Sequence, residues 1–156
     1  MNIMISACLL GYKVRYDGSD KLNQELIDIL KDHILIPICP EYLAGFSIPH
    51  PPIEYKDGRY YTNTLKDVTE MFENGAKLAF DECIKQGVDL VILKTKSPSC
   101  GKDLIYDGSF KGNLIKGNGA FTQLLIKNNI ATFKEDQIQE IIDYIKEKSS
   151  YYEVNP

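Results

Sequence analysis

The stretch VDLVILKTKSPSCG, residues 88–101, leads from an apolar run into a loop that carries a cysteine. The apolar residues at its start predict a strand over residues 88–94. The Ser, Pro and Gly residues that follow predict a tight loop around Cys100. This loop is either an ordinary turn that contains a thiol or part of a site, and the positions of the other cysteines decide between the two.

Strands and helices alternate along the chain on both sides of this stretch. Short apolar runs predict further strands over residues 2–7, 34–38 and 130–133. Apolar spacing, capping residues and stop signals predict helices over 22–31, from Thr64 to Gly87, and over 120–127 and 135–148. Thr64 is the expected cap of the longest helix, with Asp67 in its first turn.

This alternation predicts an α/β fold with a three-layer, Rossmann-like arrangement. We expect a parallel sheet of about four to five strands with helices on both faces. One domain is expected over residues 1–148, followed by a C-terminal tail over 149–156. Residues 41–63 are rich in Pro, Gly and Tyr and predict a long loop excursion, with a small hairpin around Asp57-Gly58.

Composition narrows the class of protein. The 156 residues carry 18 Lys and Arg against 22 Asp and Glu, a net charge of −4, which does not favour a general binder of DNA or membranes. No apolar stretch has the roughly 20 residues that cross a bilayer, and the apolar start lacks a basic region and a signal-cleavage site. We therefore expect a cytoplasmic protein whose cysteines are reduced thiols, metal ligands or nucleophiles.

Three of the four cysteines follow predicted strands. Cys8, Cys39 and Cys100 each come at or after the end of a strand, and in parallel sheets ligands bind beyond the carboxyl ends of the strands. The three thiols are therefore expected at the same rim. Cys83 lies instead on the apolar stripe of a helix, where a free cysteine behaves as a small hydrophobic residue.

Residue types alone leave the chemistry of these thiols open. Structural zinc prefers four ligands with paired C-x₂-C spacing, which this chain lacks, and His33 and His50 are its only histidines. Soft thiolates also select iron–sulfur clusters, and three cysteines would leave one iron of a cubane cluster open as a Lewis acid. The competing interpretation is three unrelated buried thiols.

Longer motifs resemble a known family over nearly the whole chain and in the same order. They are SACLLGYKVRYDG (6–18), CPEYLAGFSIPHPPIE (39–54), DVTEMFENGA (67–76), LKTKSPSCG (93–101), IYDGSF (105–110) and GNGAFTQLL (117–125). These segments are similar to domain-of-unknown-function family 523, which includes the thiouracil desulfidases. Two departures lie in the long loop, where His50 replaces a usual Arg and Phe46 a usual Leu.

The resemblance implies a 4Fe–4S cluster held by Cys8, Cys39 and Cys100, with one open iron. It also implies a non-redox desulfidation that converts a thiolated nucleobase, such as 2-thiouracil, to the oxo base and sulfide. A small thiolated base or nucleotide is the expected partner, without DNA or a membrane. Aerobic preparations are expected to lose the cluster or to carry zinc or another ion in its place.

The expected catalytic residues lie beside the ligands. Glu41, two residues after Cys39, is the expected general base, because a dry pocket raises the pKa of a carboxyl group. Ser97 is the first choice and Ser99 the second for passing a proton or holding the ring. The expected substrate-binding residues are Ser6, Arg15 and His50. Two alternatives stay open: a non-catalytic metal or cluster protein, and a sulfide carrier.

Overall fold

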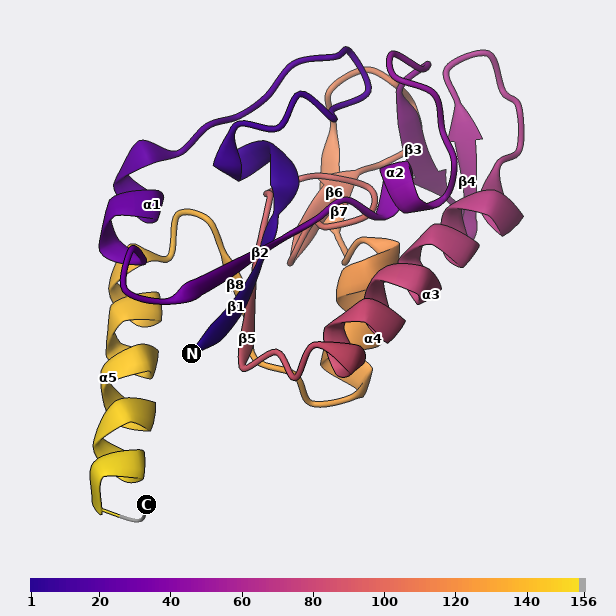
Figure 1. Cartoon of the computed structure of the whole chain (residues 1–156). Coiled ribbons are helices and arrows are strands. Elements are labelled where there is room, and N and C mark those ends of the chain that lie inside the picture. The colour runs from indigo at the N-terminus through magenta and orange to yellow at the C-terminus, as the bar shows by residue number, and fades with distance from the viewer. Residues whose placement is uncertain (155–156) are drawn as a thin grey trace.

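A four-stranded parallel sheet forms the centre of the computed structural model, which describes residues 1–154 (Figure 1). The strand order is β2-β1-β5-β8, so the first strand lies inside the sheet. The strands are β1 (Asn2–Ser6), β2 (Ile34–Ile38), β5 (Leu90–Leu93) and β8 (Thr132–Lys134). This sheet confirms the predicted parallel α/β fold.

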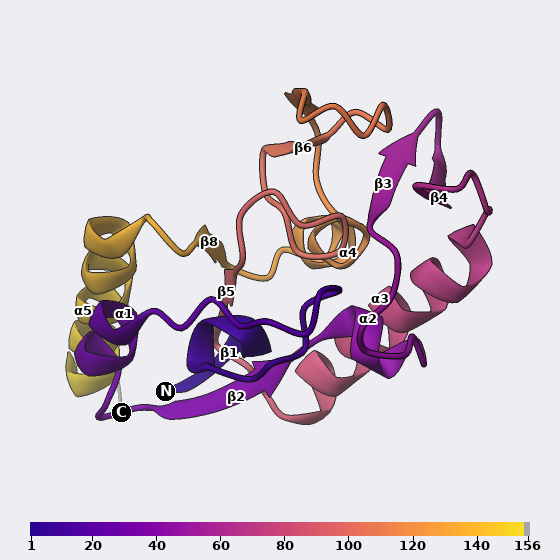
Figure 2. The same cartoon turned by 90° about the horizontal axis from the view of Figure 1, so that it is seen from above.

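Helices cover both faces of the sheet, and Figures 1 and 2 show one pair on each side. Side chains of β1 and β5 alternate between the faces, so that Met4 and Val91 pack in one buried cluster and Ile3 and Ile92 in the other. One pair comprises α3 (Thr69–Lys85) and α4 (Ala120–Lys127), and the other α1 (Gln24–Ile29) and α5 (Ile138–Val154). Among the described helices, none is long and apolar enough to cross a membrane.

Short elements surround the carboxyl ends of the strands. The excursion after β2 contains a short helix and the expected hairpin, which turns at Asp57-Gly58. A second hairpin after β5 was not predicted, because its strands have three residues each and carry no periodicity. These elements are η1 (Ala7–Leu10), α2 (Pro40–Leu43), β3 (Ile53–Lys56), β4 (Arg59–Thr62), β6 (Leu104–Tyr106) and β7 (Leu114–Lys116).

The predicted helix boundaries differ most from the structure at the start of α3 and at the end of α5. α3 begins at Thr69 rather than at Thr64, whose hydroxyl pairs with that of Thr62 instead of capping the helix. The N-cap residue is Val68, which offers no side-chain bond, and the Asp67 side chain accepts a hydrogen bond from the N–H of Thr69, the first helical residue (2.9 Å). α5 continues to Val154, so the tail expected from residue 149 is helical up to there, and its last two residues lie outside the described range.

Candidate active site

The structure brings the three strand-end cysteines to one cavity. Cys8 lies in η1 directly after β1, Cys39 precedes α2 at the end of β2, and Cys100 lies in the loop after β5. All three line a cavity of about 620 Å³ at the carboxyl ends of the parallel strands. The predicted convergence of these thiols therefore follows from the topology of the sheet.

Burial keeps these thiols protonated in the absence of a metal. It raises the pKa of Cys8 and Cys39 to about 11 and that of Cys100 to about 12. After burial, the charge of a neighbouring thiolate contributes to this rise in pKa: Cys39 acts on Cys8, and both Cys39 and Cys8 act on Cys100. A bound metal centre would replace the protons and offset this repulsion.

The chemical type of these donors suits an iron–sulfur cluster. Within residues 1–154, no group of three His, Cys, Asp or Glu side chains is close enough to hold one metal ion. In a cubane cluster, each cysteine would bind a different iron. The donor set of three soft thiols, of which Cys8 and Cys100 are buried, is compatible with such a cluster.

Hydrogen bonds between residues close in sequence shape the loop that contains Cys100. The hydroxyl of Ser97 accepts hydrogen bonds from the N–H groups of Ser99 (3.2 Å) and Cys100 (3.1 Å). The carbonyl of Ser97 accepts one from the Gly101 N–H (2.7 Å). These three hydrogen bonds to Ser97 hold the backbone of the loop around Cys100, so Ser97 stabilises the conformation of the loop.

The start of α4 holds the same loop from the other side. The N–H groups of Ala120 and Phe121 donate to the carbonyls of Pro98 (3.0 Å) and Ser99 (2.9 Å). A side chain on Gly119 would overlap the backbone of Ser99, and its Cβ would lie 2.8 Å from the Cys100 nitrogen. Gly119 is therefore required for close packing against the cysteine loop, and its N–H donates to the Gly101 carbonyl (2.8 Å).

Glu41 reaches the cavity from the first turn of α2. Its side chain is 16% exposed, and burial raises its pKa to about 7, although the Ser99 hydroxyl and the charge of Arg15 oppose the rise. This confirms the expected shift toward neutrality. A carboxyl group with this pKa can both accept and release a proton near neutral pH, as general base catalysis requires.

A chain of hydroxyl groups leads to this carboxylate. Ser99 Oγ lies 3.5 Å from Glu41 Oε2 and 3.0 Å from Ser97 Oγ. Ser99 is buried and also lies beside the Cys100 sulfur, at 3.8 Å. The second choice from the sequence, Ser99, is thus the serine that contacts Glu41, whereas Ser97 reaches it only through Ser99.

The expected substrate-binding residues have different surroundings. Ser6 and Arg15 line the cavity, and the Ser6 hydroxyl accepts a hydrogen bond from the Lys94 N–H (2.9 Å). Arg15 is steadied by the hydroxyl of Ser19 at 3.1 Å. His50 is not among the lining residues. It lies behind Glu41, with Nε2 3.9 Å from Oε1 of that residue and Nδ1 donating to the Pro51 carbonyl (2.7 Å).

Two cavity residues were missed by sequence reasoning. Glu54 comes from β3, and Phe110 comes from the connection between β6 and β7. The turn-rich stretch YDGSFKGN (106–113) lies between the short apolar runs of these two strands, which is the usual signal of a hairpin. Recognising that hairpin would have given the local structure around Phe110, but not its contact with Glu54 of β3.

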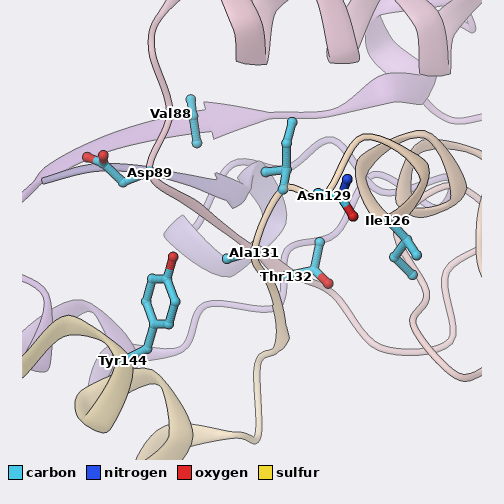
Figure 3. Close-up of a pocket in the computed structure, with 8 residues that line it drawn as sticks. Val88, Asp89, Ile126, Asn129, Ala131, Thr132 and Tyr144 are labelled. Atoms are coloured by element: carbon cyan, nitrogen blue, oxygen red, sulfur yellow. The ribbon is translucent and has the colours of Figure 1, made fainter. Parts of the chain in front are cut away.

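A second, shallower pocket of about 490 Å³ lies at the opposite end of β5 and β8 (Figure 3). Two of its polar groups have partners: the Asp89 carboxylate accepts a hydrogen bond from the Asn2 N–H, and the Thr132 carbonyl accepts one from the Lys102 ammonium. None of the cysteines lines it. The chemistry of the chain therefore lies in the cysteine cavity.

The chain is similar to known proteins over most of its length. The 2-thiouracil desulfurase family matches residues 3–137. YbbK of Bacillus subtilis (strain 168), an uncharacterized protein, is 32% identical over 150 residues, which cover 90% of this chain and 99% of YbbK. The solved structure of the 4Fe–4S-dependent thiouracil desulfidase TudS is 39% identical with a TM-score of 0.87, and the match covers 93% of this chain and 97% of that chain.

Proposed function

The chain belongs to the 2-thiouracil desulfurase family, and we propose that it replaces the sulfur of a thiouracil-type base with oxygen from water and releases sulfide. The reaction consumes one water and no electrons, since a carbon–sulfur bond breaks while a carbon–oxygen bond forms. The observation that carries this proposal is the convergence of three strand-end thiols and Glu41, whose pKa is raised to about 7, on one cavity.

Cys8, Cys39 and Cys100 are the residues that would hold the 4Fe–4S cluster. When bound, the cluster supplies a Lewis-acidic iron that attracts the sulfur of a thiocarbonyl group. The role of the protein is to keep this region dry and to orient the base. The buried positions of Cys8 and Cys100, at 8% and 4% exposure, support the first of these roles.

Glu41 is the general base in this proposal. Its carboxylate accepts a proton from the water that attacks the ring carbon, and the protonated form later returns the proton to the departing sulfur. The buried position that raises its pKa makes both transfers possible near neutral pH. Ser99 donates to the carboxylate and holds it in the orientation that faces the cavity.

The remaining contacts concern the substrate. Arg15 and Ser6 line the cavity and offer donors for a ring carbonyl or a phosphate group, whereas Ser97 orders the cysteine loop. A small thiolated base or its nucleotide would fit a cavity of about 620 Å³. The four free cysteines support a reducing, cytoplasmic location, and the acidic net charge gives no reason to invoke DNA or a membrane surface.

Anaerobic reconstitution with iron and sulfide, followed by addition of 2-thiouracil, tests this function. We expect about four irons per chain and stoichiometric release of sulfide and uracil. Glu41→Ala should keep the iron and the brown colour but lose turnover by a factor of about 10² or more, whereas the exposed Glu147→Ala should retain full activity. Unchanged turnover in Glu41→Ala would favour a structural cluster, and activity that needs a protein acceptor would favour a sulfide carrier.

A further inference from the structure

The connection between β6 and β7 is tied to β3 by a single carboxylate oxygen. Oε1 of Glu54 accepts hydrogen bonds from the backbone N–H groups of Gly108 (3.0 Å) and Phe110 (3.2 Å). More than fifty residues of chain separate the donors from Glu54. Hydrogen bonds to an ionised carboxylate are about twice as strong as those between neutral groups, so this pair is a substantial link.

Close backbone packing accompanies this link. Gly108 has a φ of +90°, and a Cβ placed on it would lie 2.6 Å from Lys56 Cβ and 2.7 Å from the Tyr55 carbonyl. The connection therefore rests directly on β3, without side chains between them. Each two-stranded hairpin is marginal by itself, so contacts of this kind decide how the two hairpins sit together.

The same link places an aromatic side chain in the wall of the cysteine cavity. Phe110 and Tyr106 line the cavity together with Glu54, and Cys8 and Cys39 line the same cavity. Phe110 has a φ of +57°, a left-handed conformation that a bulky residue adopts only when its surroundings hold it there. The hydrogen bond from its N–H to Glu54 is the contact that holds it.

We propose that Glu54 is a positioning residue, whose carboxylate fixes the 107–113 connection on β3 so that Phe110 forms an aromatic wall for the ring of the thiolated base. The part that concerns the base rests on the proposed function. Aromatic side chains hold planar bases by stacking, which favours binding more than the chemical step. Loss of Glu54 should therefore raise KM more than it lowers kcat.

Fluorescence reports the position of the connection independently of activity. The chain has no tryptophan, so Phe110→Trp provides a single emitter at the wall. In the reconstituted full chain, adding Glu54→Ala should shift the emission to longer wavelength and increase quenching by acrylamide, because the connection leaves β3. Glu54→Gln should shift less, since an amide oxygen still accepts both hydrogen bonds, and Glu147→Ala should not shift at all.

Gly108→Ala in the same Phe110→Trp background serves as a second test that leaves Glu54 in place. The added methyl group would collide with β3, so the same spectral shift is expected. Kinetics with 2-thiouracil in the chain with native Phe110 should show a KM about tenfold higher for Glu54→Ala, with kcat reduced less. If Glu54→Ala shifts the emission in the Phe110→Trp background but the unsubstituted chain shows no turnover of 2-thiouracil, the link is supported and the proposed function is refuted. Unchanged emission, quenching and KM in Glu54→Ala and Gly108→Ala would overturn the link itself.

Discussion

Ser99 Oγ lies 3.5 Å from Oε2 of Glu41, although 58 residues separate the two in the chain. Glu41 lies in the short helix α2 after β2, and Ser99 lies in the loop after β5; each is within two residues of a strand-end cysteine. The pair therefore joins the loop of Cys39 to the loop of Cys100. A substitution at this contact can change the pKa of Glu41, which the pH dependence of kcat reports. It can also change the geometry of the cysteine segments, which the iron content reports.

Ser99→Ala should reduce kcat by about ten- to a hundredfold, because a hydrogen bond to a charged group contributes about 1.5–3 kcal/mol. The Ser99 hydroxyl lowers the pKa of Glu41, so its removal should raise that pKa further. Since the base acts in its deprotonated form, the rise of kcat with pH should move to higher pH. Sulfide release measured across pH, at constant iron content, checks both effects. An unchanged pH profile of kcat in Ser99→Ala would show that the Ser99 hydroxyl does not influence the pKa of Glu41.

Glu41→Gln should make the cluster-free chain more stable at alkaline pH while abolishing turnover. The folded pKa of about 7 lies above the unfolded value near 4.5, so the folded state binds this proton more tightly. Stability is then fully present below about pH 4.5 and falls as pH rises toward 7, by up to about 3 kcal/mol. The Gln variant lacks this loss, and denaturant unfolding at about pH 5 and pH 8 measures the difference. Equal stability of both proteins at the higher pH would argue against a buried carboxylate.

Cys83→Ala should retain the cluster, whereas Cys100→Ala should lose it. Cys83 is 1% exposed on α3 and packs among apolar side chains, so its removal should cost only about 1 kcal/mol of stability. Cys100 lines the cavity and is a proposed ligand. Iron counts and absorbance after anaerobic reconstitution distinguish the two variants, and equal iron in both would remove Cys100 from the ligand set.

Gly119→Ala should loosen the cysteine loop. Its methyl group would overlap the backbone of Ser99, which is not a flexible side-chain end, so we expect a loss of about 1–3 kcal/mol and lower iron content. Gly117→Ala is the matched control, because its methyl group would meet only the Ile105 side chain, at 3.1 Å. Thermal unfolding and iron counts of both variants test this, and equal behaviour would show that close packing at Gly119 is dispensable.

Sequence reasoning recovered the parts of the fold that local patterns specify. Apolar runs such as Ile34–Ile38 and the Ala120–Lys127 helix carry enough residues for their type to be recognised. Parallel order then placed three strand ends, and with them Cys8 and Cys100, at one rim. The family assignment followed from motifs around these same loops and is confirmed by the match over residues 3–137.

The remaining features depend on contacts between segments far apart in sequence. The β6–β7 hairpin has three-residue strands that are too short for periodicity, and only its contact with β3 brings Phe110 to the cavity beside Glu54. The Thr64 hydroxyl pairs with that of Thr62 at the end of β4, so Thr64 does not begin the helix. The N–H of Thr69 at the start of α3 donates instead to Asp67. His50 was expected to bind the substrate. It is not among the residues that line the cavity, and its ring contacts the Pro51 carbonyl and the Glu41 carboxylate.

We propose that water attacks the base in this cavity with Glu41 as the proton acceptor. Turnover of 2-thiouracil by the reconstituted enzyme in H₂¹⁸O, followed by mass spectrometry of the uracil and assay of sulfide, tests this step. We expect one ¹⁸O atom in each uracil, one sulfide released per uracil, and loss of both in Glu41→Gln. Unlabelled uracil, or labelled uracil formed equally well by Glu41→Gln, would contradict it.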